Sequence, residues 1–212
     1  RKIAETQLHR GSLFVVDGKD AEPDLEEIRI HRVVWCGAAE PVLSVLGKHP
    51  DILAIAAQIL GSVRMEQLIN QAHFKLPGDG VTFPWHQDSL HRRYGTPLWQ
   101  DINGRGSFVE VCTAVDPMGP RNGGIQVIPG SCQAGHIEVD SEDRSLPANS
   151  FDPSSALDVV IPAGGIFLIH PYLIHGSGPN KSDTPRRLFL NGFAFPGANA
   201  RKYPGQGAGR MV

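Results

Sequence analysis

The chain has 212 residues, 41% of them hydrophobic, which suits one domain with a sizeable core. Its formal net charge of −2 and the lack of any run of like charges argue against a nucleic-acid partner. Three cysteines are typical of a reducing, cytoplasmic protein, and no apolar run approaches the roughly 18 residues that span a membrane.

The N-terminal part of the chain is predicted to be helical. It begins at Arg1 rather than methionine, so we expect residues upstream, which could carry a targeting signal. Apolar residues recur at helical spacing over 41–46 and 51–60, and we expect a helical front over about residues 1–66. The apolar stripe of the second helix consists of Ile52, Ile55, Ala56 and Ile59.

From about residue 67 the pattern changes to short strands. Apolar stretches are separated by clusters of proline and glycine, which favours a sandwich or barrel. We expect a single domain, with a barrel core over about 67–195 and a C-terminal tail over 196–212. The predicted strands cover residues 68–76, 108–115, 125–128, 157–161, 166–169 and 188–195.

A histidine and a carboxylate two residues apart form the first candidate site, in the sequence Trp85-His86-Gln87-Asp88. Side chains alternate faces along an extended strand, so His86 and Asp88 would project the same way. His175, between an apolar run and a glycine-rich turn, could supply a third ligand from a distant strand. Two imidazoles and one carboxylate bind Fe(II) and leave the opposite face of the metal open. The alternatives are a surface His-x-Asp pair and a core histidine at 175.

Arg186 argues against a purely structural metal at this site. It follows His175 by eleven residues and heads the last apolar strand, so its side chain could enter the barrel. Arginine binds a carboxylate through two parallel hydrogen bonds and stays charged when desolvated, which suits the distal carboxylate of a 2-oxo dicarboxylic acid. Ser177 could donate a further hydrogen bond, and Arg187 should face the other way. A solvated arginine at a strand start is the alternative.

Further candidates lie on neighbouring strands and on a long loop. Cys112 and Thr113 could form the wall of the co-substrate site, with core packing as the alternative. Gln71, His73 and Lys75 share one face of the preceding strand, and one of them could reach the oxo acid or the substrate. The loop over 89–106 leaves Asp88 directly, so its early residues must pass near the open side of the metal. We therefore predict His91 and Trp99 as substrate contacts, with ordinary loop anchoring as the alternative.

Three motifs, in order, resemble the phytanoyl-CoA dioxygenase family of Fe(II)/2-oxoglutarate oxygenases. They are residues 85–88, residues 122–131 and residues 170–187, and the resemblance runs over about 67–195. It implies a mainly β fold, a double-stranded β-helix or jelly-roll with N-terminal helices packed on one sheet. The opening helix and strand of the family are not recognisable in this chain, which we attribute to truncation.

The resemblance also implies a function and its residues. His86, Asp88 and His175 would hold Fe(II), and Arg186 and Ser177 would hold 2-oxoglutarate. The expected enzyme is a dioxygenase that uses O2 to hydroxylate a small organic metabolite and releases succinate and CO2. Related halogenating enzymes have a small residue in place of the carboxylate, so Asp88 favours hydroxylation or another oxidation such as desaturation. A zinc enzyme on a similar barrel and a non-enzymatic small-molecule-binding barrel remain open alternatives.

Overall fold

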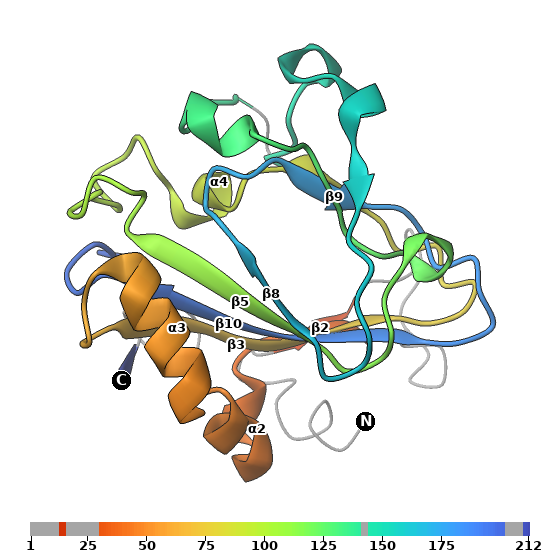
Figure 1. The fold of residues 1–212 in the computed structure, drawn as a ribbon, viewed down its shortest axis with the longest axis horizontal. Coiled ribbons are helices and arrows are strands. Elements are labelled where there is room, and N and C mark those ends of the chain that lie inside the picture. Colours follow the sequence, from red (N-terminus) through yellow and green to blue (C-terminus); the bar gives the residue numbers. More distant parts are fainter. Residues whose placement is uncertain (1–12, 16–29, 141–143, 202–209) are drawn as a thin grey trace.

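The computed structural model describes residues 13–15, 30–140, 144–201 and 210–212 (Figure 1). Their strands form two antiparallel sheets, one larger than the other. The larger sheet has the order β1-β2-β3-β10-β5-β8, with β11 also paired to β3, and the smaller has the order β4-β9-β6-β7. The prediction of a mainly β jelly-roll is confirmed.

The bounds of the elements are as follows. The larger sheet contains β1 (Leu13–Val15), β2 (Ile30–Val33), β3 (Glu66–Lys75), β5 (Phe108–Ala114), β8 (Ile166–Ile169), β10 (Arg186–Ala194) and β11 (Arg210–Met211). The smaller sheet contains β4 (Phe83–His86), β6 (Gln126–Val127), β7 (Leu157–Asp158) and β9 (His175–Ser177). The α-helices are α2 (Pro41–Leu46), α3 (Pro50–Leu60) and α4 (Asp88–Arg92). The short 3-10 helices are η2 (Cys36–Ala38), η3 (Pro120–Asn122), η4 (Ser131–Ala134), η5 (Ala148–Ser150) and η6 (Pro153–Ser155).

The predicted helices and strands are present, most with ends shifted by a few residues. Two differences concern the expected division of the chain. The expected helical front also contains β1 and β2, which extend the larger sheet, and β11 of the expected tail pairs with β3. Because β1 and β2 belong to the larger sheet, one edge of that sheet lies outside the expected barrel core, while the other edge, β8, lies within it.

Helix α3 covers the outer face of the larger sheet (Figure 1). Pro50 occupies its first turn, and Gly61 ends it in a left-handed conformation with φ of 72°, which glycine adopts without strain. Its buried residues are Ile52, Ala56 and Leu60, spaced by four, and they pack against Val109, Val111 and Phe193 of the sheet. The expected stripe was therefore partly wrong, because Ile55 and Ile59 are exposed.

Successive side chains along the central strands point alternately to the outer face of the larger sheet and to the interior of the barrel. Leu188 and Leu190 of β10 face the interior, and Phe189 between them packs outward on Val33 and Cys36.

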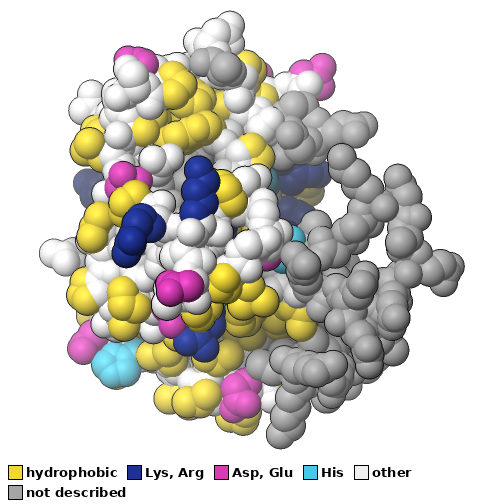
Figure 2. Space-filling model, turned by 90° about the vertical axis from the view of Figure 1, so that its right-hand side faces the viewer, with side chains coloured by type: hydrophobic (Ala, Val, Ile, Leu, Met, Phe, Trp, Pro, Cys, Tyr) yellow, Lys and Arg dark blue, Asp and Glu magenta, His cyan; other side chains and the backbone are white. Residues whose placement is uncertain are grey.

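On the face of the molecule in Figure 2, described charged side chains are separated by apolar and neutral ones and form no continuous basic surface there. Among the described residues, no helix is both long and apolar enough to cross a membrane.

Candidate active site

Two histidines face each other across a pair of strands in the smaller sheet. His86 is the last residue of β4, and its register partner is His175, the first residue of β9. The two strands approach closely at Gly176, where an added Cβ would lie 3.1 Å from the carbonyl oxygen of Phe83. A larger residue would push the strands apart, so glycine at this position helps to keep the imidazoles together.

The carboxylate reaches the histidines from a helix rather than from a strand. Asp88 is the first residue of α4, which corrects the expectation that it continues the preceding strand. The preceding residue, Gln87, is fully buried and fixes the turn. Its amide nitrogen donates to the carbonyl oxygens of Gly135 and Tyr172, and its oxygen accepts from the backbone N–H of Ile137.

The three side chains, called the triad below, have the geometry of a metal site. Oδ1 of Asp88 lies 3.9 Å from Nε2 of His86 and 3.9 Å from Nε2 of His175, and the candidate ligand atoms lie within 4.8 Å of one another. Nδ1 of His86 contacts the carbonyl oxygen of Pro84 at 2.7 Å, and Nδ1 of His175 contacts that of Leu173 at 3.0 Å. A carbonyl oxygen only accepts, so each Nδ1 donates the proton, which leaves Nε2 as the nitrogen that can bind a metal.

Electrostatics favour the protonation states that a metal needs at two members of the triad, His86 and Asp88. Burial, followed by the charge of His175, lowers the pKa of His86 to about 4, although Asp88 opposes this shift. Burial would raise the pKa of Asp88, but its electrostatic interactions with four neighbours outweigh burial and lower this pKa: His175, His86, His91 and Arg92. Oδ2 of Asp88 is buried and has no hydrogen-bond partner among the described residues. A neutral imidazole and an ionised carboxylate with a free oxygen fit a divalent cation.

A buried cation lies in the same pocket as the triad. Arg186, 1% exposed, begins β10, and its Nε is buried without a hydrogen-bond partner in the described chain. Burial lowers the pKa of Arg186 to about 10, against the effect of Asp79, so the guanidinium is charged at neutral pH. Lys75 donates from Nζ to Oγ of Ser177 at 2.6 Å and to the carbonyl oxygen of Gly178 at 2.5 Å. Ser177 accepts this bond and therefore keeps its own proton available for an acceptor in the pocket.

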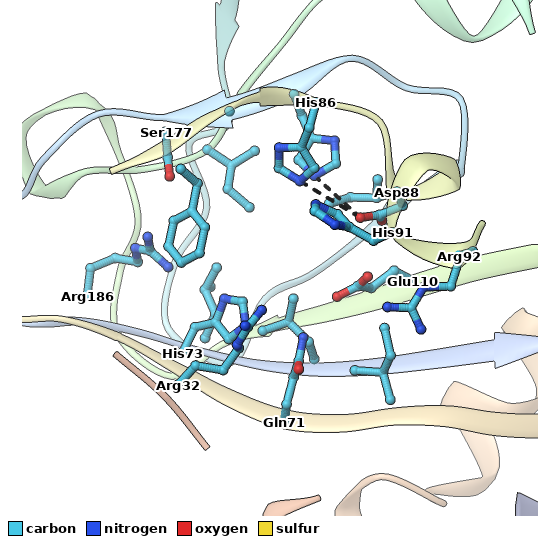
Figure 3. A pocket seen from close by; sticks show the side chains of 18 residues that line it. Arg32, Gln71, His73, His86, Asp88, His91, Arg92, Glu110, Ser177 and Arg186 are labelled. Atoms are coloured by element: carbon cyan, nitrogen blue, oxygen red, sulfur yellow. Dashed lines mark ion pairs between the residues drawn. The ribbon is translucent and has the colours of Figure 1, made fainter. Parts of the chain in front are cut away.

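The triad and Arg186 line one pocket between the two sheets (Figure 3). In this view, Arg186 and Ser177 lie on one side and His86 and Asp88 on the other, with apolar side chains between them. The pocket encloses about 720 Å³, including its open mouth.

The structure separates the two predicted substrate contacts. His91 lines the pocket, and its ring centroid lies 5.0 Å from that of His86. Trp99 is buried in the core, where it stacks on Tyr94 at 4.8 Å and meets the edge of Phe108, and it is not among the residues that line the pocket. We correct that expectation and regard Trp99 as a packing residue, because the loop folds back onto the sheet after α4.

The five candidates for the wall of the pocket also divide. Gln71 and His73 line it, and His73 stacks on Phe83 at 5.3 Å. Cys112 is fully buried in the interior core but does not line the pocket, and Thr113 is opposite Phe189 on the outward face of the sheet. Lys75 reaches the site through Ser177, as described above.

Three charged residues of the pocket were not predicted from the sequence: Arg32, Arg92 and Glu110. Glu110 lies two residues before Cys112, so strand alternation could have placed it on the inward face. Arg92 lies one helical turn after Asp88, but α4 was expected to be a loop. Arg32 lies in β2, a strand that no pattern indicated, and no signal in the sequence could have found it.

Comparison with known proteins identifies relatives. The family model described as "Phytanoyl-CoA dioxygenase (PhyH)" matches residues 6–188. L-proline trans-4-hydroxylase of Streptomyces griseoviridis is 27% identical over 186 residues, covering 73% of this chain and 63% of that protein. Phytanoyl-CoA dioxygenase domain-containing protein 1 of Mus musculus is 27% identical over 162 residues, covering 72% and 52%. The chain thus spans about half to two-thirds of the length of these relatives.

A solved structure has the same fold. EvdO2 from Micromonospora carbonacea var. aurantiaca, complexed with 2-oxoglutarate, has a TM-score of 0.64 and 23% identity, covering 95% of this chain and 85% of that chain. The family match begins at residue 6 and therefore extends further toward the N-terminus than the resemblance over about residues 67–195. Since the match extends over most of the chain, this protein belongs to the phytanoyl-CoA dioxygenase (PhyH) family.

Proposed function

We propose that the chain is an Fe(II)- and 2-oxoglutarate-dependent dioxygenase that hydroxylates a small organic molecule. The observation that carries this proposal is the buried triad in one pocket with the charged guanidinium of Arg186, whose Nε has no hydrogen-bond partner among the described residues. A metal alone explains the triad, and an anion alone explains Arg186. A metal-bound 2-oxo dicarboxylate explains both, because it chelates the metal at one end and carries a free carboxylate at the other.

In this proposal, Nε2 of His86, Nε2 of His175 and the carboxylate of Asp88 hold the iron. The carbonyl oxygens that accept from each Nδ1 fix the tautomer and the orientation of both rings, so that little reorganisation accompanies metal binding. Zinc accepts the same three ligands, but a zinc hydrolase has no need of a buried cation such as Arg186. This difference favours iron with an anionic co-substrate over the zinc alternative.

Arg186 and Ser177 bind the distal carboxylate of 2-oxoglutarate in this proposal. The guanidinium supplies two parallel hydrogen bonds, and the hydroxyl of Ser177 supplies another, since its oxygen already accepts from Lys75. Lys75 adds a second buried amine beside the carboxylate. The L-proline trans-4-hydroxylase relative supports hydroxylation of a small molecule, and the complexed EvdO2 structure supports 2-oxoglutarate as co-substrate.

Bound iron and 2-oxoglutarate would supply the oxidising chemistry, with O2 consumed and succinate and CO2 released. The residues of the chain would bind, orient and enclose the reactants. His91, next to His86 on the open side of the triad, would contact the substrate and limit the access of water. The apolar side chains between Arg186 and the triad would hold the carbon chain of 2-oxoglutarate extended.

Anaerobic titration tests the proposal directly. Protein loaded with Fe(II) should develop a weak visible charge-transfer band when 2-oxoglutarate is added, and protein loaded with Zn(II) should not. Asp88→Ala should lose the band together with tight iron binding, and Arg187→Ala, outside the pocket, should keep it. If iron binds but 2-oxoglutarate produces no band at saturating concentration, the zinc-dependent or non-enzymatic alternative is correct.

A further inference from the structure

His73 places a polar atom without a hydrogen-bond partner at the wall of the pocket. It belongs to β3, its side chain lines the pocket, and its Nε2 is buried with no partner among the described residues. A buried polar atom that makes no hydrogen bond costs free energy, so each one needs an explanation, such as a ligand that it binds. His73 has no role among the proposed iron ligands or among the residues proposed to bind the distal carboxylate.

Strand register places His73 between the two proposed binding ends of the oxo acid. Lys75 and Arg186 are partners across β3 and β10. His73 and Leu188 form the next pair on the inward face, two residues or about 7 Å along the strands. Figure 3 shows His73 between Arg186 on one side of the pocket and His86 on the other. A ligand that extends from Arg186 to the metal must therefore pass His73.

An aromatic contact fixes the plane of the His73 ring. His73 stacks on Phe83, with 5.3 Å between the ring centroids and 5° between the ring planes. Nζ of Lys75 lies 5.3 Å from the centroid of the same Phe83 ring, and Phe83 is the register partner of Ser177. One phenyl ring thus connects His73 to the residues around the proposed carboxylate site, and little freedom remains for the imidazole to turn away.

The side chains around His73 favour a hydrogen-bond acceptor as its partner. Burial, followed by the charges of four basic side chains, lowers the pKa of His73 well below its ordinary value: Arg32, Arg186, Lys75 and His86. Arginine and charged lysine only donate hydrogen bonds, so they cannot accept one from an imidazole. A neutral imidazole carries one N–H, which either nitrogen can hold, and a protonated imidazole carries two. In both states His73 can donate to an anion, and a carboxylate accepts from it and from the neighbouring cations together.

We propose that His73 is a further binding residue for 2-oxoglutarate, which donates a hydrogen bond from Nε2 to a carboxylate oxygen of the co-substrate. This inference rests on the proposed function and adds a residue to its co-substrate site. An ionised carboxylate offers about four acceptor positions, so hydrogen bonds from Arg186 and Ser177 do not exhaust it. The stacked ring also presents its nitrogen in a fixed direction, so that little ordering accompanies binding.

Three variants separate the hydrogen bond from the packing of the ring. His73→Phe keeps a ring against Phe83 but removes the N–H, and it should raise the dissociation constant of 2-oxoglutarate at least about tenfold, the value of one hydrogen bond to a charged group. His73→Gln places an amide N–H near the position of Nε2 and should lose less. His73→Ala should lose at least as much as His73→Phe. The constants come from anaerobic charge-transfer titration of the iron-loaded protein.

The same replacement outside the pocket is the control. His49 is an exposed residue immediately before α3, and His49→Phe should leave the affinity for 2-oxoglutarate unchanged. Thermal unfolding without ligand adds a readout that a packing role would move differently. Because Nε2 of His73 has no partner in the described chain, His73→Phe should unfold at the same temperature as the unmodified protein or higher, although it binds the co-substrate more weakly.

A spectroscopic signal tests the contact without iron chemistry and without dependence on the stability of a variant. In Zn(II)-loaded protein labelled with nitrogen-15 at histidine, 2-oxoglutarate should shift the Nε2 resonance of His73. This resonance is identified by its absence from the His73→Gln variant. If 2-oxoglutarate binds and the resonance does not move, His73 does not contact the co-substrate.

Failure of this inference can be told apart from failure of the proposed function. A charge-transfer band that gives the same dissociation constant in the unmodified protein and in His73→Phe would overturn the role of His73 and leave the dioxygenase in place. Tighter binding by His73→Phe than by His73→Gln would overturn it too, because the ring rather than the N–H would then matter. Absence of the band from the unmodified protein would overturn the dioxygenase, and with it the inference that depends on it.

Discussion

Replacing Arg186 by alanine is the most direct test of the proposed co-substrate site. The side chain is 1% exposed, and its Nε has no partner in the described chain, so its stabilising contacts would come from the ligand. A bidentate pair with a carboxylate contributes two charge-assisted hydrogen bonds of about 1.5–3 kcal/mol each. Loss of at least about 3 kcal/mol raises the dissociation constant of 2-oxoglutarate by about a hundredfold or more.

Two assays measure this loss independently. Anaerobic titration of the iron-loaded protein gives the dissociation constant from the charge-transfer band. Thermal unfolding gives it from stabilisation by the ligand: at a concentration one hundred times the dissociation constant, a ligand stabilises by about 2.7 kcal/mol. After a hundredfold loss of affinity, the same concentration gives only about 0.4 kcal/mol, so the rise in Tm should nearly vanish.

Arg187→Ala is the matched control for this variant. Arg187 is adjacent, its side chain is 46% exposed, and it pairs with Asp116 at 2.7 Å, an exposed ion pair worth about 0–1 kcal/mol of stability. Its removal should leave 2-oxoglutarate affinity unchanged. If Arg187→Ala lost affinity and Arg186→Ala kept it, the assignment of the inward face of β10 to the co-substrate would be refuted.

Four further predictions follow from the pocket and from the core beside it. Asp88→Ala should abolish turnover and weaken iron binding, measured by metal content after dialysis; normal turnover in this variant would remove Asp88 from the ligand set. Burial, followed by Arg186, lowers the pKa of Lys75 to about 7, and a bound dianion would raise it again. Binding must then take up a proton above pH 7, so 2-oxoglutarate affinity should fall as pH rises from 7 to 9, and this slope should disappear in Lys75→Met. His91→Ala should uncouple 2-oxoglutarate consumption from substrate hydroxylation with little change in iron affinity, and equal coupling in both proteins would exclude a substrate contact. Trp99→Ala should instead lower the free energy of unfolding by about 3–5 kcal/mol, measured by denaturant titration.

The local sequence determines most of the fold and part of the site. Short apolar stretches between proline and glycine clusters predicted the strands, because each stretch must bury one face of a sheet. The spacing of His86 and Asp88 predicted that they meet, and the structure brings them together with His175. Asp88 meets the two histidines for a different reason than side-chain alternation along a strand. It lies in the first turn of α4, which Gln87 anchors.

Tertiary packing decides the features that the sequence did not predict. Trp99 follows α4 on a polar stretch, but the chain folds back there and Tyr94 and Phe108 enclose the indole. Arg32 becomes a pocket residue only because β2 adds to the edge of the larger sheet beside β3. Neither event leaves a periodic pattern, because each depends on contacts between segments far apart in the chain.

Helix α4 connects the metal ligand to a proposed substrate contact. Gln87 holds the start of α4 by three hydrogen bonds to segments around residues 135–137 and 172, which fixes Asp88 with respect to the histidines. His91 follows Asp88 by three positions in the same single turn, so the two backbone positions are fixed together. Arg93 ends the helix with a positive φ of 69°. In the proposed function, a metal ligand and a substrate contact therefore depend on the same anchor, and replacing Gln87 by alanine should disturb both.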